Sequence, residues 1–556
     1  MRWTFLPFLA LLSGCVGPQL ATRPVLPVPT APVEVQILAF NDFHGNLVAP
    51  PPIEVTAPDG SKSMLASGGV ARLAQALADQ RKGNPLTITV SAGDLIGASP
   101  LVSGAFLDEP TINAMNIVGL DLNAVGNHEL DKGPLELWRM QGGGCATFTT
   151  LKPCALEPFG GAKFRFLAAN VRTAEGVTLF APTAIRQFGP VKIGFIGMTL
   201  QGTGNLVSPA SSAGLTFEDE AATANALVPS LKEQGADTIV LLIHQGGRLP
   251  VFGSGQGCDG IDGPILPILD KLDPAITTVV SGHTHYAYVC QRGGRLLTSA
   301  GKYGYLFSDL RLRFDPSTRG LIGQHAKNLV TGTGEQGEDP GVKTLVDRYV
   351  VAAAPVANRV IGRLSGPAPR DDKNGESPAA NLNADAFQYA GRNARARIAL
   401  VNATGVRVAL VPDANGSVTY GQAFSMMPFT NHVVVKSLTG AQLKALLEQQ
   451  FNAASYPAGA KPALLVPSAG FTFDYDLNRP RGSRIVALRL DGNRVSPTAR
   501  VRVATNNYLA NGGDGYSVLT EGTDAVDAGL DIDALAGWLA KGQRVPVVGR
   551  TRNVTR

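Results

Sequence analysis

FNDFHGN, residues 40–46, begins where the apolar run VEVQILAF (33–40) ends. Such a run predicts a buried β-strand. Asp42 and His44 follow it two positions apart, and side chains at i and i+2 of an extended chain point to the same side. A carboxylate and an imidazole that face one point can both bind a cation. The stretch therefore predicts a strand that ends at a metal-binding or catalytic site.

An apolar run followed by a polar turn recurs four more times in the first half of the chain. Ligands and catalytic groups gather beyond the carboxyl ends of strands in open α/β sheets. Five of the seven histidines lie in these turns, a concentration that a structural role alone does not explain. The later turns supply Asp94 after LTITV (86–90), Asn127, His128 and Asp131 after LNAV (122–125), His244 after TIVLLI (238–243), and His283 and His285 after TTVVS (277–281).

Helical patterns separate the apolar runs, as in GGVARLAQALADQ (68–80). Strands that alternate with helices predict a mixed α/β domain whose sheets are covered by helices. The glycine-rich, acidic segment TGTGEQGEDPG (331–341) then precedes a helical pattern at 342–354 that links to a second domain. In that domain SLTGAQLKALLEQQF (437–451) predicts a helix that Thr439 is placed to cap.

The first fifteen residues predict an export signal. Arg2 precedes an apolar segment that is too short to span a membrane, and LSGC (12–15) follows it. LSGC resembles the bacterial lipoprotein box, which implies that Cys15 is lipidated; an ordinary signal peptide with a chance cysteine is the alternative. The proline-rich segment that follows favours a stiff spacer. We therefore expect a protein that is exported and lipid-anchored in the bacterial envelope, with the outer membrane favoured over the inner. The predicted organisation is a signal at 1–15, a tether at 16–33, a first domain at 34–335, a linking helix at 340–360 and a second domain at 361–552.

The charge of the chain bears on its binding partners, and its cysteine content bears on its disulfides. The net charge of +5 is small for 556 residues, and no long block of Lys or Arg appears, so there is no electrostatic argument for binding a nucleic-acid polymer. Besides Cys15, an even number of cysteines remains, which in an exported protein predicts disulfides. Nearness favours Cys145–Cys154 and Cys258–Cys290, although three pairings are possible. A thiolate zinc site is the weaker alternative because the chain has no C-x-x-C pair.

The types of ligand in the polar turns define the metal chemistry. Imidazole and carboxylate without thiolate suit zinc, manganese, iron or similar divalent ions rather than calcium. The number of candidate ligands exceeds what one ion takes up, so two ions are expected. A shared carboxylate would bridge them at about 3.5–4 Å. Such a pair can deprotonate a water and hold phosphate oxygens in line for displacement.

These motifs, in this order, resemble those of the calcineurin-like metallophosphoesterases. The second half resembles the C-terminal substrate domain of the 5′-nucleotidase family. The resemblance covers about residues 33–530 and implies a four-layer α/β/β/α first domain and a smaller α/β substrate-binding domain, joined by a helix. The segments that carry the second resemblance are ESPAANLNADA (376–386), NATGVR (402–407), YGQAFSMMPFTN (420–431) and NNYLANGGDGY (506–516).

The resemblance implies a role for each residue of the first domain's turns. His128 would contact the phosphoryl group in the transition state, and Asp131 would orient its ring. The chemistry agrees, because a carboxylate behind an imidazole fixes its tautomer and raises its basicity, and a developing phosphoryl anion requires positive charge. The implied metal ligands are Asp42, His44 and His285 for the first ion, Asp94 as the bridge, and Asn127, His244 and His283 for the second.

Residues of the second domain are implied to bind the substrate. Arg407 and Arg370 would bind phosphate, for which the planar guanidinium of arginine is suited. Phe429 and Tyr508 would stack on the nucleobase, a contact worth about 1–3 kcal/mol per base. The remaining implied contacts are hydrogen bonds from Asn431 and Asp514 to the base edge or the ribose.

The resulting expectation is an enzyme that removes phosphate from nucleoside 5′-monophosphates. A 2′,3′-cyclic nucleotide phosphodiesterase or a UDP-sugar pyrophosphatase would keep the chemistry and change the substrate. A non-catalytic, nucleotide-binding surface lipoprotein would lack metal ligands, and none is missing. Departures from the family pattern bear on substrate preference: Ala403 and Thr404 replace a Pro-Gly or Gly-Gly pair, PAANLN (378–383) replaces LGNLIA, and Tyr508 replaces Phe and adds a hydroxyl. The sequence gives no indication of the oligomeric state.

Overall fold

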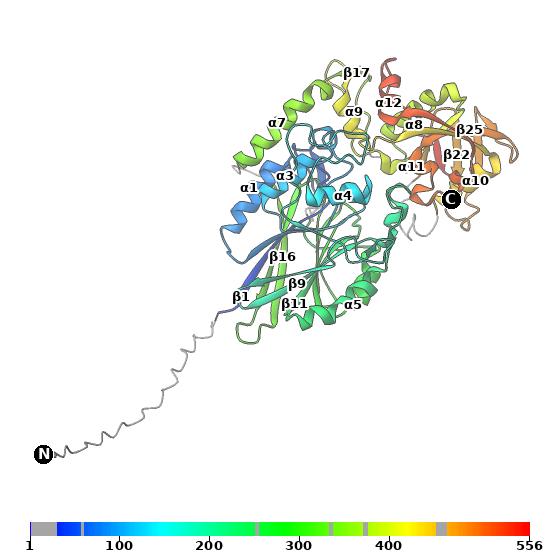
Figure 1. Cartoon of the computed structure of the whole chain (residues 1–556). Coiled ribbons are helices and arrows are strands. Elements are labelled where there is room, and N and C mark those ends of the chain that lie inside the picture. Colours follow the sequence, from blue (N-terminus) through cyan, green and yellow to red (C-terminus); the bar gives the residue numbers. More distant parts are fainter. Residues whose placement is uncertain are drawn as a thin grey trace.

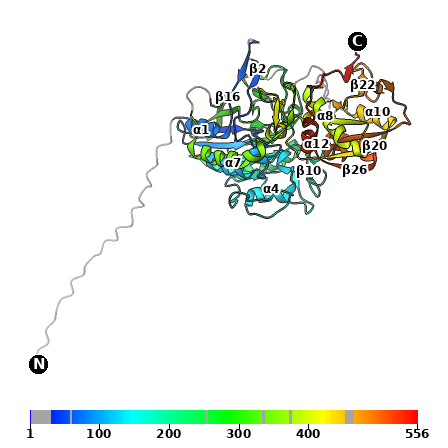
Figure 2. The ribbon, with the colours of Figure 1, turned by 90° about the horizontal axis from the view of Figure 1, so that it is seen from above.

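A computed structural model gives the architecture of the chain (Figures 1 and 2). The predicted signal, Cys15 and most of the tether lie outside the described residues. Within the described part of the chain, no helix is long and apolar enough to cross a membrane. The structure describes residues 1, 31–56, 60–250, 255–332, 337–370, 376–451 and 464–555.

The first domain is built on two sheets packed face to face. One has the strand order β16 (Leu321–Val330), β15 (Leu306–Phe314), β1 (Val33–Phe40), β4 (Thr87–Ser91), β5 (Leu122–Ala124) and β6 (Arg165–Leu167). The other has the order β13 (Ala287–Arg292), β14 (Arg295–Ala300), β12 (Ile276–Ser281), β11 (Thr238–His244), β9 (Val191–Thr199) and β8 (Thr183–Phe188).

Strand β1 is buried from Val35 onward, which is why most of its residues are apolar. Val35 and Ile37 point into the core between the two sheets, whereas Leu38 and Phe40 point into the core beneath the helices. A strand buried on both faces reads as a continuous apolar run. Strands β1, β4, β5 and β6 run parallel, so their carboxyl ends meet at one edge of the sheet.

Helices cover the outer faces of both sheets and complete four layers, as the fold class predicted. The first sheet is covered by α1 (Val70–Arg81), α3 (Glu109–Val118), α4 (Gly133–Gly142) and α7 (Pro340–Ala357), and the second by α5 (Glu220–Glu233) and α6 (Ile265–Lys271). α7 contains the predicted helix of 342–354. The shorter elements are β2 (Ile53–Thr56), β3 (Lys62–Leu65), α2 (Leu101–Gly104), η1 (His128–Leu130), β7 (Val171–Arg172), η2 (Gln201–Asn205) and β10 (Thr216–Phe217).

The second domain, yellow to red in Figure 1, lies beside the first. Its main sheet has the order β21 (Leu465–Pro467), β18 (Ile398–Asn402), β25 (Arg500–Asn506), β20 (His432–Thr439) and β26 (Thr523–Leu530). A smaller sheet has the order β24 (Asn493–Arg494), β23 (Ile485–Leu490), β22 (Phe471–Tyr475) and β27 (Thr551–Asn553), and β17 (Val360–Arg363) pairs with β19 (Ser417–Thr419).

Helices pack on both faces of the main sheet of the second domain. Ile398 and Leu400 share a core with helix α10 (Gly440–Gln449), and Ala399 and Val401 share one with the helices of the opposite face. The predicted cap of α10 is confirmed, because the Thr439 side chain accepts a hydrogen bond from the Gln442 N–H at 3.2 Å. The other helices are α8 (Pro378–Ala390), η3 (Gly391–Ala394), η4 (Ala403–Gly405), α9 (Tyr420–Met426), α11 (Asn507–Ala510), η5 (Gly513–Gly515), η6 (Ser517–Glu521) and α12 (Asp531–Leu539).

The structure contains the two disulfides that short sequence separation favoured, Cys145–Cys154 and Cys258–Cys290.

The first disulfide adjoins a buried ion network. Arg139 binds Glu109 at 2.7 Å and Glu136 at 2.6 Å, and all three side chains are buried. Glu109 also accepts the Cys154 N–H at 2.9 Å, so the network ties the disulfide loop to helix α3.

Replacing Arg139 with methionine is expected to lower the free energy of unfolding by about 3–5 kcal/mol, because two buried carboxylates would lose their counter-charge. Denaturant unfolding measures the change. The control is Arg172→Met, which removes a solvent-exposed pair with Glu218 and should cost less than about 1 kcal/mol. Equal losses in both variants would show that burial of the Arg139 network contributes nothing.

Candidate metal centre and substrate site

Five of the seven predicted metal ligands lie in turns with unusual backbone conformations. These five have positive φ although they are not glycines, which costs about 1–3 kcal/mol per residue and persists only where neighbouring structure fixes it. These turns follow β1, β4 and β12 and bring side chains from separate parts of the sequence to one point. The residues concerned are Asp42 (φ 50°), His44 (φ 48°), Asp94 (φ 52°), His283 (φ 70°) and His285 (φ 64°).

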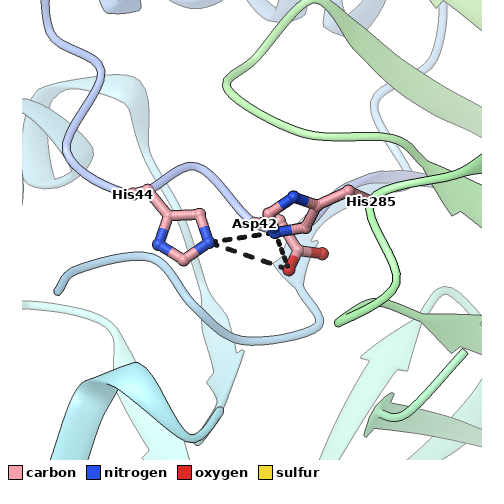
Figure 3. Close-up of side chains that lie close together, drawn as sticks. All are labelled: Asp42, His44 and His285. Atoms are coloured by element: carbon pink, nitrogen blue, oxygen red, sulfur yellow. Dashed lines mark hydrogen bonds and ion pairs between the residues drawn. The ribbon is translucent and has the colours of Figure 1, made fainter. Parts of the chain in front are cut away.

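Asp42, His44 and His285 form the first cluster (Figure 3). The Nε2 atom of His285 lies 3.3 Å from Asp42 Oδ1 and 3.3 Å from His44 Nε2. His44 Nδ1 lies 2.9 Å from the carbonyl oxygen of Gly97, to which its N–H donates. That bond leaves the Nε2 lone pair of neutral His44 directed at the cluster, as a metal ligand requires.

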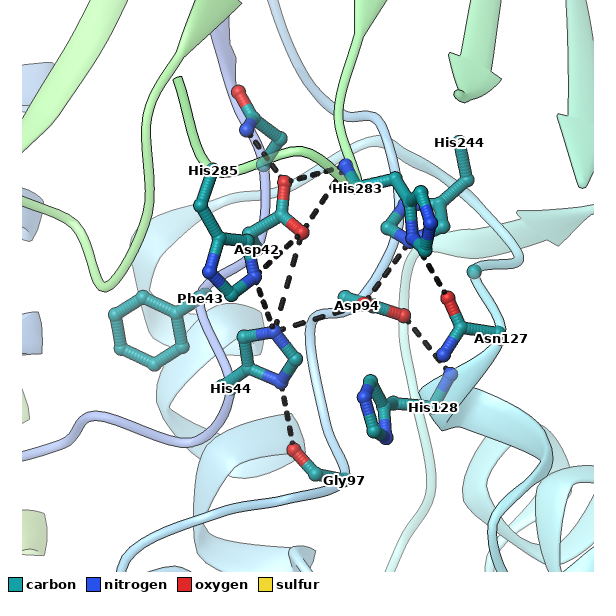
Figure 4. Close-up of polar contacts among 12 residues, drawn as sticks. Asp42, Phe43, His44, Asp94, Gly97, Asn127, His128, His244, His283 and His285 are labelled. Carbon is teal, nitrogen blue, oxygen red and sulfur yellow. Dashed lines mark hydrogen bonds and ion pairs between the residues drawn. The ribbon is translucent and has the colours of Figure 1, made fainter. Parts of the chain in front are cut away.

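Asp94, His244 and His283 form the second cluster (Figure 4). His244 Nε2 lies 3.0 Å from Asp94 Oδ2, and His283 Nδ1 lies 3.1 Å from Asn127 Oδ1. The same Asp94 oxygen lies 3.6 Å from His44 Nε2 in the first cluster. Asp94 therefore stands between the two clusters, and the structure brings every sequence-predicted ligand to one place.

The donor set fits divalent cations. His244 Nδ1 lies 2.8 Å from the Ala92 carbonyl, so its N–H donates there and Nε2 keeps a lone pair. That buried Nε2 lies 3.0 Å from Asp94 Oδ2, which is also an acceptor, so a proton or a cation has to join the two atoms. Burial lowers the pKa of His244, but Asp94, Asp42 and Glu129 outweigh it and raise the pKa to about 10. The site thus calls for positive charge, which a divalent ion supplies.

Two neighbours of the ligands were not predicted. Glu129 accepts the N–H groups of Asp94 at 2.9 Å, Leu95 at 2.8 Å and Gly126 at 2.7 Å, which fixes the turn that carries Asp94. Burial and the Asp94 charge raise the pKa of Glu129 to about 7. Asn41 donates to Asp42 Oδ2 at 2.6 Å. Asn41 lies inside the stretch FNDFHGN, and Glu129 directly follows His128, so adjacency to predicted site residues was the indication that the sequence offered.

His128 pairs with Asp131, as predicted. Its Nδ1 lies 2.8 Å from Asp131 Oδ2, and its backbone N–H donates to Asp94 Oδ1 at 2.9 Å. Burial lowers the pKa of His128, but the negative charges of Asp131 and Asp94 outweigh it, so the pKa is raised. The Phe429 ring of the second domain stacks on the His128 ring at 6.2 Å between centroids. The His128 imidazole thus lies between the two ligand clusters and the second domain.

The arginines of the second domain reach the same place. Arg407 Nη2 lies 3.1 Å from His44 Nε2, and Arg370 donates from Nε to the Val406 carbonyl at 2.7 Å, next to Arg407. Burial together with the charges of Arg407, Lys302 and Arg370 holds the pKa of His285 well below its usual range. This concentration of cations suits a bound anion.

Lys302 and Tyr303 were also not predicted. The Lys302 ammonium lies 4.8 Å from the centroid of the Tyr303 ring. That ring lies 5.9 Å from both the His44 and the His285 rings. The segment GKYGY (301–305) follows strand β14 and carries no motif, so only the tertiary structure reveals its position.

Tyr508, Asp514 and Asn431 have partners within the protein. The Tyr508 hydroxyl lies 2.6 Å from Asp514 Oδ1 and 2.9 Å from the Asn205 carbonyl of the first domain. The Asn431 backbone N–H donates to Asp531 Oδ2 at 3.0 Å. The two rings predicted to clamp a base therefore have different neighbours here, because Phe429 stacks on His128 and Tyr508 reaches Asn205.

Comparison with known proteins agrees with this geometry. A family model for the calcineurin-like phosphoesterases matches residues 35–287, and one for the 5′-nucleotidase C-terminal domain matches residues 351–521. The 5′-nucleotidase of Bos taurus is 25% identical over 545 residues, which cover 92% of this chain and 89% of that protein. The crystal structure of a 5′-nucleotidase precursor from Thermus thermophilus matches with a TM-score of 0.76 at 26% identity, covering 94% of this chain and 100% of that one.

A further relative is much longer than this chain. Endonuclease YhcR of Bacillus subtilis (strain 168) is 26% identical over 485 residues, which are 87% of this chain but only 37% of YhcR. The match to YhcR thus covers only part of that protein. The two family models each match one domain of this chain. These two matches, the four-layer fold and the converging ligands together show that this chain belongs to the 5′-nucleotidase family of phosphoesterases.

Proposed function

We propose that this protein hydrolyses nucleoside 5′-monophosphates to nucleoside and phosphate at a pair of divalent metal ions. The observation that carries the proposal is the position of Asp94. One of its oxygens lies 3.0 Å from His244 and 3.6 Å from His44, each of which belongs to a different ligand cluster. A carboxylate shared in this way is what two neighbouring ions require.

The ligand assignment follows the clusters. Bound ions of the zinc or manganese type would supply positive charge for the phosphoryl oxygens and activate the attacking water. The carboxylates and imidazoles are held ready for them by hydrogen bonds from Asn41 and to the carbonyls of Gly97 and Ala92. The proposed ligands are Asp42, His44 and His285 for one ion, Asn127, His244 and His283 for the other, and Asp94 for both.

The chain's own side chains bind and orient the substrate. His128, protonated and aligned by Asp131, donates a hydrogen bond to the phosphoryl group as charge develops on it. Arg407 and Arg370 hold the phosphate from the second domain. Phe429 and Tyr508 supply the aromatic faces for the base, with Asn431 and Asp514 as polar partners.

The export signal, the lipid anchor on Cys15 and the domain limits at 335, 340 and 361 remain part of this proposal. The bonded pairs Cys145–Cys154 and Cys258–Cys290 support an oxidising compartment, because disulfides are rare in the cytosol. Mass spectrometry of the mature N-terminus, from cells that express the full chain, tests the anchor. An acylated Cys15 is expected as the first residue. An unmodified mature chain that begins at another residue would contradict the lipid anchor.

Substrate kinetics test the proposed activity. Purified protein with zinc or manganese should release phosphate from AMP with a higher kcat/KM than from 2′,3′-cyclic AMP, and faster than it cleaves UDP-glucose. A preference for the cyclic nucleotide would assign a phosphodiesterase, and a preference for UDP-glucose a pyrophosphatase. Tight AMP binding without any turnover in the presence of metal would identify a binding protein instead.

A further inference from the structure

A buried lysine stands behind the predicted substrate residues of the second domain. Lys436 lies in strand β20, HVVVKSLT, directly after three valines, and is only 9% exposed. Lysine is almost never buried without partners. The partners that the structure gives its ammonium are main-chain carbonyls, those of Ala510 at 3.0 Å and Leu519 at 2.7 Å. Burial disfavours the charged ammonium and so lowers the pKa of Lys436.

The two carbonyls lie at either end of one irregular segment. Ala510 ends helix α11, and Leu519 lies in the short helix η6. The Ala510 carbonyl stands at a helix end, where carbonyls lack partners within the helix, and the Leu519 carbonyl also accepts the Gly522 N–H at 3.3 Å. Between them the chain turns through Asp514, whose φ of 54° is left-handed. We call residues 507–521 the substrate loop, and Lys436 binds both of its halves from outside.

The position of Tyr508 depends on this loop. Its hydroxyl accepts the Asp514 N–H at 2.9 Å and lies 2.6 Å from the Asp514 carboxylate. Its ring lies against Gly513 so closely that a Cβ there would be 2.5 Å from ring atoms. Asn402 of β18 donates to Asp514 at 2.9 Å from the other side. The ring thus rests on the backbone that Lys436 fixes.

We propose that Lys436 is a positioning residue for recognition of the nucleoside. Its ammonium holds the substrate loop in the conformation in which Tyr508 and Asp514 face the base and ribose. A lysine suits this task because its three N–H donors can bind two carbonyls at once. The inference rests on the proposed function. It adds a residue that contacts neither substrate nor metal and acts only on the nucleoside half of the substrate.

Two substrates separate this role from a general structural one. AMP uses the substrate loop, whereas p-nitrophenyl phosphate carries no base or ribose and needs the metal centre, His128 and the phosphate-binding arginines. Lys436→Met keeps an unbranched side chain, one atom shorter, and removes the N–H donors. We expect it to lower kcat/KM for AMP by about 10-fold, the scale of one lost base contact, mainly through KM. The rate with p-nitrophenyl phosphate should change less than about 2-fold on the same reasoning.

Two further variants complete the experiment. Lys436→Arg retains a charged donor and should recover part of the affinity for AMP. Lys444→Met, at an exposed lysine of α10 in the same domain, is the matched control and should leave both substrates unchanged. Hydrogen exchange should be faster in residues 507–521 of Lys436→Met and unchanged in the first domain.

Each outcome decides between the two claims. Unchanged AMP kinetics in Lys436→Met would overturn the inference, and so would equal losses on AMP and p-nitrophenyl phosphate, which indicate general unfolding. Neither result would contradict the proposed role of the metal centre. Wild-type protein that cleaves p-nitrophenyl phosphate but no nucleotide would contradict the proposed function instead, and the role of Lys436 would fall with it.

Discussion

Replacing Asp94 with asparagine is expected to lower kcat for AMP by about 10³-fold or more, the scale at which a directly acting charged group is lost. Asp94 offers Oδ2 to His244 and His44 and accepts the His128 N–H through Oδ1 at 2.9 Å. An asparagine carries no charge and would turn an N–H₂ group toward one of these neighbours. Steady-state kinetics at saturating metal, together with the metal content of the variant, measure the loss.

A carboxylate of the same sheet provides the control. Asp121 lies just before strand β5, and its side chain accepts the Thr89 N–H at 2.9 Å. It belongs to neither ligand cluster. Asp121→Asn should leave kcat within about 2-fold of wild type, because it changes no group within reach of the ions. An Asp94→Asn enzyme as active as the Asp121→Asn control would show that the two clusters do not share this carboxylate.

The second large effect is expected at His128. His128→Gln should lower kcat by about 10²- to 10⁴-fold, the usual contribution of a positioned acid or base. Metal content should be unchanged, because the proposed ligands are all retained. Measuring both quantities in one preparation distinguishes this variant from Asp94→Asn. Loss of metal from His128→Gln would make His128 a ligand rather than a hydrogen-bond donor to the phosphoryl group.

The pH profile provides an independent test of His128. Asp131 and Asp94 raise its pKa, so the protonated form persists above the usual value of 6.5 and activity should fall as the pH rises through the shifted pKa. Asp131→Asn removes a negative charge that stabilises the imidazolium. The falling limb of kcat should therefore move to lower pH. A limb that stays in place would mean that another group controls it.

Much of the site could be predicted from the sequence because its residues immediately follow strands. The backbone of β1 or β12 determines where Asp42 or His283 goes, and parallel strands bring their carboxyl ends together whatever the loops do. The disulfides were predictable for a similar reason, since short separations restrict the choice of partner. These features depend on local sequence and on one topological rule.

Apart from Asn41, which adjoins Asp42, the residues that were missed owe their positions to contacts across the fold. Glu129 acts through backbone groups 34 and 35 residues earlier in the chain. From the sequence, Lys436 is expected to be a solvated residue of a strand. In the structure it binds two carbonyls that lie 74 and 83 residues further along the chain. Phe429 and Tyr508 were both expected at the base, but which ring faces His128 depends on how the two domains meet. No periodicity or motif encodes such distances.

Metal content per chain tests the central claim most directly. The full chain, loaded with zinc or manganese and dialysed against metal-free buffer, is analysed for bound metal by mass spectrometry with inductively coupled plasma. Two ions per chain are expected, and fewer in Asp94→Asn, because Asp94 is shared by both clusters. A fully active wild-type enzyme that retains one ion or none would contradict the paired-metal account.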